Sequence, residues 1–322
     1  MTATEPLLQV RELRVTFATE RGPLVAVDGV SFDIAAGEVL GVVGESGSGK
    51  SVSLMSVLGL LGASAQVEGS VRFRGRELVG LPERELRVLR GGQIAMVFQD
   101  PMTALTPVYT VGAQIVEQIR LHEPQSRTAA KARAIELLAA VGLPSPAAQF
   151  ERYPHQLSGG MRQRAVIAMA LSCRPSLLIA DEPTTALDVT VQAQILALLE
   201  RLRRELQLAV VLVTHDMGVV AEVADRVLVM YAGRVVERGT ARALFDAPRH
   251  PYTRGLLGSI PPLEGARPQR LPSIGGAPPA LHERPPGCAF APRCAQAEAR
   301  CRETAPPLRD DFGHAVACVL QP

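Results

Sequence analysis

The feature that most constrains the fold is a glycine-rich segment that directly follows a short apolar run. Residues 38–43 (EVLGVV) have the character of a buried parallel strand, and residues 44–51 (GESGSGKS) come next. Glycines at positions 44, 47 and 49 let the backbone curl so that its N–H groups face an anion. A helix expected over residues 51–61 points its positive end at the same place. The segment predicts a phosphate-binding loop in an α/β protein; a glycine-rich turn that opens an ordinary helix is the alternative.

Two residues of this loop have chemical roles of their own. We expect Lys50 to reach the β and γ phosphates of a nucleotide and Ser51 to place its hydroxyl on Mg²⁺. The residues predicted to contact the nucleotide here are Gly44, Ser46, Gly47, Ser48, Gly49, Lys50, Ser51 and Val52.

Two carboxylates follow a second apolar run, at residues 177–180 (LLIA). The predicted strand ends in Asp181 and Glu182, and Pro183 stops it there. Ligands of α/β proteins bind at the carboxyl ends of the strands. We expect Asp181 to hold the Mg²⁺ shell, usually through water, and Glu182 to act as general base on the attacking water.

Two further polar residues stand at predicted strand ends. His215 comes shortly after the apolar run at residues 209–213 (AVVLV), which places it at the same sheet edge, near the γ-phosphate. We expect it to hydrogen-bond phosphate and to hold the attacking water. Gln99 follows residues 94–98 and is a weaker signal. Taken alone, it indicates only a polar residue that caps a strand end.

These segments occur in one order with LSGGM at residues 157–161 and Ala186-Leu187-Asp188 after the acidic strand. Together they resemble the nucleotide-binding subunits of ABC transporters. The resemblance implies an α/β P-loop ABC ATPase with a RecA-like core, an antiparallel β subdomain and a helical signature subdomain. It also implies ATP hydrolysis with Mg²⁺ in a head-to-tail dimer, where Ser158, Gly159 and Gly160, opening a helix over residues 161–172, close over the ATP of the partner subunit.

The resemblance also implies roles for three other residues. Gln99 is expected to contribute to the Mg²⁺ site and to link it to the membrane subunits, and Asp188 to communicate across the dimer. An aromatic residue near the amino end stacks on adenine in the family, and Phe17 is the candidate for it; Phe17 as a core residue is the alternative. The signature ends in Met161 where many members have Gln, a departure that does not touch the phosphate-facing positions.

The composition agrees with a globular enzyme. The formal net charge of +2 over 322 residues gives no electrostatic reason to expect nucleic acid as a partner. The apolar stretches fall short of the ~20 residues needed to span a bilayer, and the first nine residues lack an export signal. We therefore expect a cytoplasmic chain that touches membranes only through partners, and the resemblance implies a peripheral location on the cytoplasmic face of the inner membrane.

The segment order predicts two domains. An ATPase domain is expected over residues 1–243, with a helical subdomain at about residues 103–172, and a Cys-containing extension over residues 244–322 with a Pro/Gly-rich linker at residues 261–286. The helical subdomain includes an amphipathic segment at residues 127–141. In the family, this subdomain and the Gln99 loop form the groove that receives a coupling helix of the membrane subunit; residues 153–156 (YPHQ) are expected to join that contact.

Four of the five cysteines, Cys288, Cys294, Cys301 and Cys318, stand in the extension, whereas Cys173 is expected only to pack in a helix. Thiols of a cytosolic protein stay reduced, so metal ligation explains the group better than disulfides do. The spacing lacks the CxxC pairs of zinc ribbons. We therefore expect a 4Fe-4S cluster; zinc, with His314 as a substitute ligand, and plain reduced cysteines are the alternatives.

The extension indicates which branch of the family the chain resembles. Residues 250–261 (HPYTRGLLGSIP) and 287–294 (GCAFAPRC) are similar to the tail of ATPase subunits from oligopeptide, dipeptide and nickel importers, some of which carry an iron–sulfur cluster on these cysteines. The expected partners are two permeases, a second and different ATP-binding subunit, and an extracytoplasmic substrate-binding protein. The dipeptide type is the nearest match, and we expect the importer to carry dipeptides or oligopeptides.

Other functions stay open at this point. An importer for nickel or another small solute is the main alternative, because the sequence does not identify the solute. A soluble ABC ATPase outside transport is disfavoured, since neither a second cassette nor a long coiled-coil insertion is present. A regulatory subunit that holds ATP without hydrolysing it, with the cysteines as a redox sensor, is disfavoured by the presence of Glu182 and His215.

Overall fold

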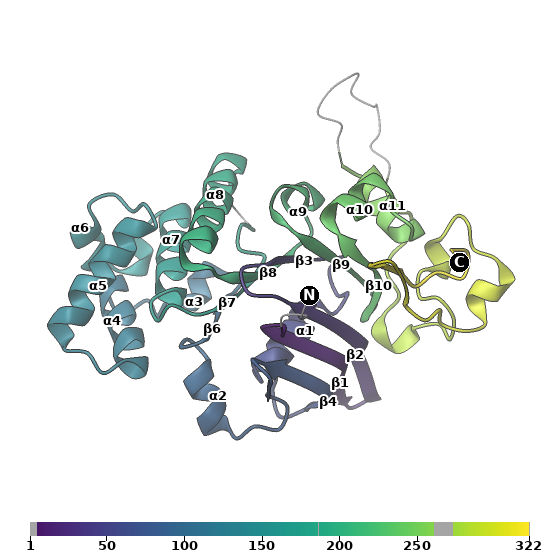
Figure 1. The fold of residues 1–322 in the computed structure, drawn as a ribbon, viewed down its shortest axis with the longest axis horizontal. Helices are drawn as coiled ribbons and strands as arrows, with labels where there is room; N and C mark the ends of the chain where they lie inside the picture. The colour runs from purple at the N-terminus through teal and green to yellow at the C-terminus, as the bar shows by residue number, and fades with distance from the viewer. Residues whose placement is uncertain (1–4, 186, 261–272, 322) are drawn as a thin grey trace, which may run out of the picture. The chain divides into compact units, whose positions relative to one another are not determined.

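The computed structural model describes residues 5–185, 187–260 and 273–321 (Figure 1). The chain divides into two compact units. One comprises Met1–Ile34, Val39–Val79 and Leu212–Pro322, and the other comprises Ala35–Glu38 and Gly80–Val211. Strand β8 (Ala209–Thr214) contains the point where the chain passes from the second unit back to the first.

The first unit contains an antiparallel sheet in the order β2-β1-β4-β5. Its long strands alternate buried apolar with exposed polar residues, as a sheet with one face covered requires; Val10 and Phe32, for example, are fully or almost fully buried partners across β1 and β2. Strands β2, β1 and β4 lie side by side in Figure 1. The bounds of the four strands are β1 (Leu8–Thr19), β2 (Gly22–Ile34), β4 (Ala65–Phe73) and β5 (Arg76–Glu77).

A second set of strands in this unit includes β3 (Val39–Val43), which directly precedes the phosphate-binding segment. Strand β3, buried at all five positions, pairs in parallel with β9 (Arg226–Tyr231). The sheet continues antiparallel through β10 (Arg234–Thr240), β12 (His314–Val316) and β11 (Arg309–Asp311). The helices of this unit are α1 (Lys50–Val57), α9 (Met217–Val223), α10 (Ala241–Asp246) and α11 (Pro251–Gly258).

The carboxyl-terminal segment shares a core with the strands of the first unit. Tyr252 of α11 and Phe290 pack against Tyr231 at the end of β9, with ring centroids 4.6 to 5.3 Å apart. The pairing of β12 with β10 adds backbone hydrogen bonds to this contact. Three short turns complete the segment, namely η2 (Leu281–Glu283), η3 (Ala291–Arg293) and η4 (Ala299–Arg302).

The second unit has two parallel strands and a group of helices. Strand β6 (Ile94–Val97) pairs with β7 (Leu177–Asp181), and the buried apolar run of β7 fits a strand covered on both faces. Side chains cap the main helices at Thr110, Ser126, Ser158 and Asp188. The helices are α2 (Glu83–Leu89), α3 (Pro101–Ala104), α4 (Val111–His122), α5 (Arg127–Ala140), α6 (Pro146–Phe150), η1 (Pro154–Gln156), α7 (Gly159–Ala170) and α8 (Val189–Leu206).

The predicted α/β class is confirmed, with differences at two helix ends. Helix α1 stops at Val57, earlier than expected, because Gly59 takes a positive φ of 59°. Helix α7 begins at Gly159, two residues early, because the Ser158 hydroxyl caps it. Residues 261–272 of the predicted linker lie outside the described residues, and the domain division near residue 243 stays a prediction. Within the residues that the structure describes, no helix is long and apolar enough to cross a membrane.

Candidate functional site

The glycine-rich loop has the backbone geometry that its sequence predicts. It links β3 to α1 and has positive φ at Gly44, Gly47 and Gly49, of 153°, 76° and 97°. A Cβ on Gly44 would stand 2.2 Å from the Met230 carbonyl oxygen. The loop therefore requires glycine at this position for space as well as for conformation.

Lys50 is held inside the curve of the loop. Its side chain is 5% exposed, and Nζ donates to the carbonyl oxygens of Gly44 at 2.7 Å and Glu45 at 3.0 Å. A buried ammonium needs such partners. Ser51 follows at the first turn of α1, where the N–H groups of a helix are available to an anion.

The predicted base and the predicted linking residue are in contact in the second unit. Gln99, just after β6, donates from Nε2 to Oε2 of Glu182 at 3.0 Å. The Thr185 hydroxyl donates to the same carboxylate oxygen at 2.9 Å. Sequence reasoning missed Thr185; its hydroxyl three residues after the base was the available signal. Two donors fix this carboxylate in one orientation.

Glu182 also has an unusual backbone. Its φ is 48°, in the left-handed region that residues with a side chain rarely adopt. Asp181, the last residue of β7, and Glu182 have different surroundings: Asp181 is buried at 4% exposure, whereas Glu182 is half-buried. Strained backbone of this kind is concentrated at functional sites.

The signature segment presents the amino end of α7. Ser158 Oγ accepts from Met161 N at 3.3 Å, and both Ser158 and Gly159 are exposed. Gly160 lies against α8, where an added Cβ would approach Val191 Cγ1 to 2.7 Å. Asp188 caps α8 through Val191 N at 2.9 Å. Ala186, predicted with Asp188 as one motif, lies outside the described residues.

His215 and Phe17, two of the predicted site residues, belong to the first unit. Their roles stay predictions. His215 is exposed directly after β8, and Asp216 caps the following helix α9 through Gly218 N at 2.9 Å. Phe17 is half-buried near the end of β1, opposite Leu24 of β2. The half-buried ring leaves both the stacking and the packing interpretation open to experiment.

The expected iron–sulfur cluster is not supported. Among the residues that the structure describes, no group of three or more Cys, His, Asp or Glu side chains is arranged to hold a metal ion. The four tail cysteines are free thiols around an apolar pocket that Phe290 and Leu320 also line. Burial raises the pKa of the Cys288 and Cys294 thiols, which favours their neutral form. The prediction of a 4Fe-4S cluster, or of zinc in its place, was wrong because clustering in sequence does not provide ligand geometry.

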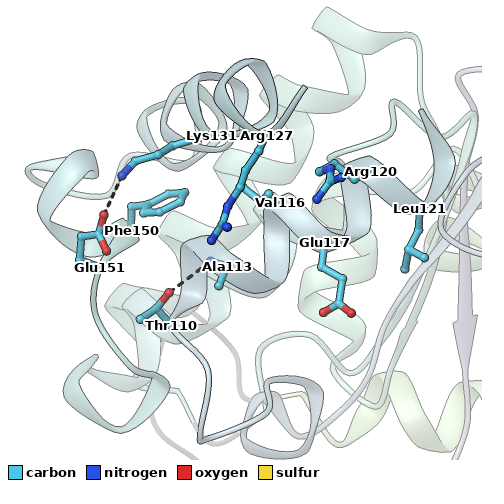
Figure 2. A pocket seen from close by; sticks show the side chains of 10 residues that line it. All are labelled: Thr110, Ala113, Val116, Glu117, Arg120, Leu121, Arg127, Lys131, Phe150 and Glu151. Atoms are coloured by element: carbon cyan, nitrogen blue, oxygen red, sulfur yellow. Dashed lines mark hydrogen bonds and ion pairs between the residues drawn. The ribbon is translucent and has the colours of Figure 1, made fainter. Parts of the chain in front are cut away.

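A hollow of about 570 Å³ lies in the second unit, at helices α4, α5 and α6 (Figure 2). Charged side chains line it, and Figure 2 shows the ion pair of Lys131 with Glu151, at 2.8 Å. Arg120 and Arg127 add positive charge, and the Phe150 ring adds an apolar wall. None of the residues predicted to bind nucleotide lines this hollow, so it is separate from the predicted site.

Comparison with known proteins decides the family. The family model "ABC transporter" matches residues 27–185, and "Oligopeptide/dipeptide transporter, C-terminal region" matches residues 236–301. The oligopeptide transport ATP-binding protein OppD of Salmonella typhimurium is 53% identical over 94% of this chain and 90% of that protein. The dipeptide transport ATP-binding protein DppD of Haemophilus influenzae is 50% identical over 97% and 94%.

The chain belongs to the ATP-binding subunits of the oligopeptide/dipeptide ABC transporter family. The fold agrees: a dimeric ATP-binding cassette solved in a post-hydrolysis state with ADP and Pi superposes with a TM-score of 0.66, at 30% identity, over 73% of this chain and 99% of that one. The predicted ABC ATPase fold and the ATPase activity that comes with it are therefore confirmed.

The loop around Lys50 and the Gln99–Glu182 pair remain the elements that the motifs predict to bind and hydrolyse the nucleotide. The contacts of each element are described above; the individual roles of these residues in binding and catalysis stay predictions. One contact was not predicted at all: Arg293 of the extension reaches Glu45 of the phosphate-binding loop.

Proposed function

We propose that this chain hydrolyses ATP, with Mg²⁺, to power the uptake of dipeptides or oligopeptides across the cytoplasmic membrane. The observation that carries the proposal is the match of residues 236–301 to the carboxyl-terminal region of oligopeptide and dipeptide transporters. Relatives at 50–53% identity, over almost the whole chain, are named for oligopeptide or dipeptide transport. Nothing in the described residues favours nickel over peptide.

The residues around the proposed magnesium site fit that ion. Ser51, Gln99 and Asp181 offer hydroxyl, amide and carboxylate oxygens, which are the donors that Mg²⁺ prefers. When bound, Mg²⁺ neutralises charge that develops on the β and γ phosphates. The glycine-rich loop supplies N–H groups to the phosphates, and Lys50 supplies a positive charge.

Glu182 is suited to be the general base. Gln99 and Thr185 both donate to its Oε2 and orient the carboxylate that would accept a proton from the attacking water. The strained φ of Glu182 is the backbone feature that sets its carboxylate apart from the buried Asp181. We propose that His215 orients the water and the γ-phosphate.

We propose that two ATP-binding subunits act head to tail. Ser158 and Gly159 are exposed at the amino end of α7, where they are accessible to the phosphates of a partner subunit. Val189, next to Asp188, is 84% exposed, which is unusual for an apolar side chain and suits an interface. The second subunit is proposed to be a different chain of the same family.

We propose that the second unit also contacts two permease subunits on the cytoplasmic face of the inner membrane. Apolar side chains are exposed before and at the end of α4, with Val108 at 70% and Tyr109 at 59% in the turn that precedes the helix, and Leu121 at 72% in its last turn. Tyr153 stacks on His155 at 5.7 Å in the segment before the signature, where sequence predicts the same contact. An extracytoplasmic binding protein completes the proposed importer.

The test is transport by the assembled complex. The chain, co-expressed with the neighbouring permease and ATPase genes, is reconstituted in vesicles with the binding protein and ATP. Uptake of a labelled dipeptide or oligopeptide that stops without ATP is the expected result. ATP-driven uptake of nickel without peptide uptake would contradict the peptide assignment.

A further inference from the structure

The carboxyl-terminal extension touches the phosphate-binding loop at Glu45, the second residue of GESGSGKS. Arg293, beside Cys294, makes a bidentate ion pair with this carboxylate. Its Nη1 lies 2.5 Å from Glu45 Oε2 and its Nη2 lies 2.9 Å from Oε1. Two parallel N–H···O bonds fix direction as well as distance, so this contact restrains where Glu45 lies.

Contacts with residues other than Glu45 also hold the Arg293 side chain in place. Its side chain is 5% exposed, and Nε donates to the Gly275 carbonyl oxygen at 2.9 Å. The Tyr231 hydroxyl accepts from Nη1 at 3.2 Å, and the guanidinium lies 5.8 Å from the Tyr231 ring centroid. The hydrogen bonds to Glu45 raise the pKa of Arg293, so the guanidinium is charged at every relevant pH.

A second residue of the extension holds the backbone of Glu45. The Glu45 N–H donates to the Tyr252 hydroxyl at 2.8 Å. Tyr252 is fully buried and packs against Tyr231 and Phe290, so these two rings position its hydroxyl. The extension thus holds both the side chain and the main chain of one loop residue.

Glu45 is in turn part of the hydrogen-bond network of the loop. Its carbonyl oxygen accepts from Lys50 Nζ at 3.0 Å and from the Ser48 N–H at 3.2 Å. A shift of Glu45 therefore changes the position of the lysine and the curvature of the loop. Preorganised N–H groups and charges bind phosphate better than mobile ones, because ordering them costs free energy on binding.

We propose that Arg293 and Tyr252 are positioning residues for ATP: the extension fixes Glu45, and the affinity of the loop for ATP depends on that contact. The proposal rests on the ATPase function. The contacting residues come from the two segments of the extension with the clearest sequence character, HPYT at residues 250–253 and APRC at residues 291–294. The extension is thereby a structural part of the nucleotide site.

The decisive experiment compares ATP binding by the full chain with that of Arg293→Met and Glu45→Gln. Each variant removes one half of the ion pair, and we expect the Kd for a non-hydrolysable ATP analogue to rise about tenfold. The double variant is expected to bind no more weakly than either single one, because the two residues act as one unit. Arg293→Lys keeps the positive charge but lacks the planar guanidinium that makes two parallel hydrogen bonds. Its Kd for the analogue is expected to lie between those of Arg293→Met and the wild type.

A matched control separates positioning from general attachment of the extension. Arg238→Met removes a different ion pair between strand β10 and the extension, that of Arg238 with Asp310 at 3.2 Å, which is remote in sequence from the loop. Its Kd for the analogue is expected to equal the wild-type value. An Arg293→Met chain with wild-type Kd, or one no weaker than Arg238→Met, would overturn the proposal.

Two further readouts cover the case in which Arg293→Met does not fold. Tyr252→Phe keeps the ring and removes only the hydroxyl, and it is also expected to weaken ATP binding. In the assembled transporter, this variant is expected to raise the KM for ATP more than it lowers kcat. Binding is reciprocal, so ATP is expected to slow hydrogen exchange at residues 288–294 of the wild type. A Tyr252→Phe chain with unchanged Kd, together with no protection by ATP, would refute the proposal; a wild type that binds no ATP would instead refute the proposed function.

Discussion

The amide of Gln99 donates a hydrogen bond to the carboxylate of Glu182, with 3.0 Å between Nε2 and Oε2. The two residues are 83 positions apart in sequence and follow the neighbouring parallel strands β6 and β7. A residue proposed to report on the membrane partner therefore contacts the residue proposed to activate water. Movement of the Gln99 loop would reorient the base directly.

Thr185→Val tests the second donor to this carboxylate. The change removes the hydroxyl at nearly constant volume, so Glu182 loses an orienting hydrogen bond. We expect kcat of the assembled transporter to fall roughly tenfold, with little change in the KM for ATP, since the loss affects orientation in the transition state. Thr185→Ser, which keeps the hydroxyl, is the control, and equal kcat in the two variants would contradict the assignment.

Lys50→Ala is expected to abolish measurable ATP binding. The change removes the buried ammonium that the loop holds against Gly44 and Glu45. Lys131→Ala, which breaks a surface ion pair with Glu151, is the matched control and is expected to bind ATP as the wild type does. Equilibrium titration with a fluorescent ATP analogue makes the comparison; similar affinities for the two variants would exclude Lys50 from the site.

Ser158→Ala separates the structural role of the signature serine from its proposed role in the dimer. The loss of the cap on α7 is expected to lower the free energy of unfolding by about 1 kcal/mol. Ser158→Asp keeps an N-cap acceptor but places a negative charge near the partner's phosphates, and it is expected to be stable yet inactive. Thermal melts and ATPase rates of the assembled transporter distinguish the two; an active Ser158→Asp variant would contradict the dimer model.

His250 predicts a pH dependence of stability. Burial lowers its pKa to about 4, against a hydrogen bond with the backbone of Ala317 that opposes the shift. The unfolded chain therefore binds a proton near pH 6.5 that the folded chain does not bind until about pH 4. This stabilisation is complete above pH 6.5 and is lost as the pH falls, by about 3 kcal/mol at pH 4.

His250→Asn supplies the control for this prediction. His250 Nδ1 accepts from Tyr252 N at 3.1 Å at the start of α11, and an Asn side-chain oxygen can accept in the same way without titrating. Chemical unfolding between pH 7 and pH 4 is expected to show a smaller loss of stability in the variant. An identical loss in both chains would show that His250 does not control it.

Much of the nucleotide site was predictable because its residues form contiguous motifs. The order of strand, glycine-rich loop and helix around Lys50 follows from local backbone preferences and from the hydrophobic pattern. The family and the α/β fold followed from the same segments. Helix ends such as Val57 were less predictable, because they depend on single residues that cap or break the helix.

Contacts between distant segments were not predictable from the sequence. Nothing near Arg293 or Glu45 indicates that these residues pair, since the contact depends on how the extension packs against β9. For the cysteines, in contrast, the sequence led to the prediction of a site that the structure does not support. Their clustering suggested an iron–sulfur cluster, but among the described residues the thiols do not have the arrangement that a metal ion requires.

The most direct test of the account is Glu182→Gln in the reconstituted transporter, assayed for ATP turnover, bound nucleotide and peptide uptake. The amide keeps the size of the side chain but is a poor base, so we expect turnover to fall by ~100-fold or more. ATP is expected to stay bound without hydrolysis, and uptake to stop. Wild-type turnover and uptake in this variant would contradict the assignment of Glu182 as the base that drives transport.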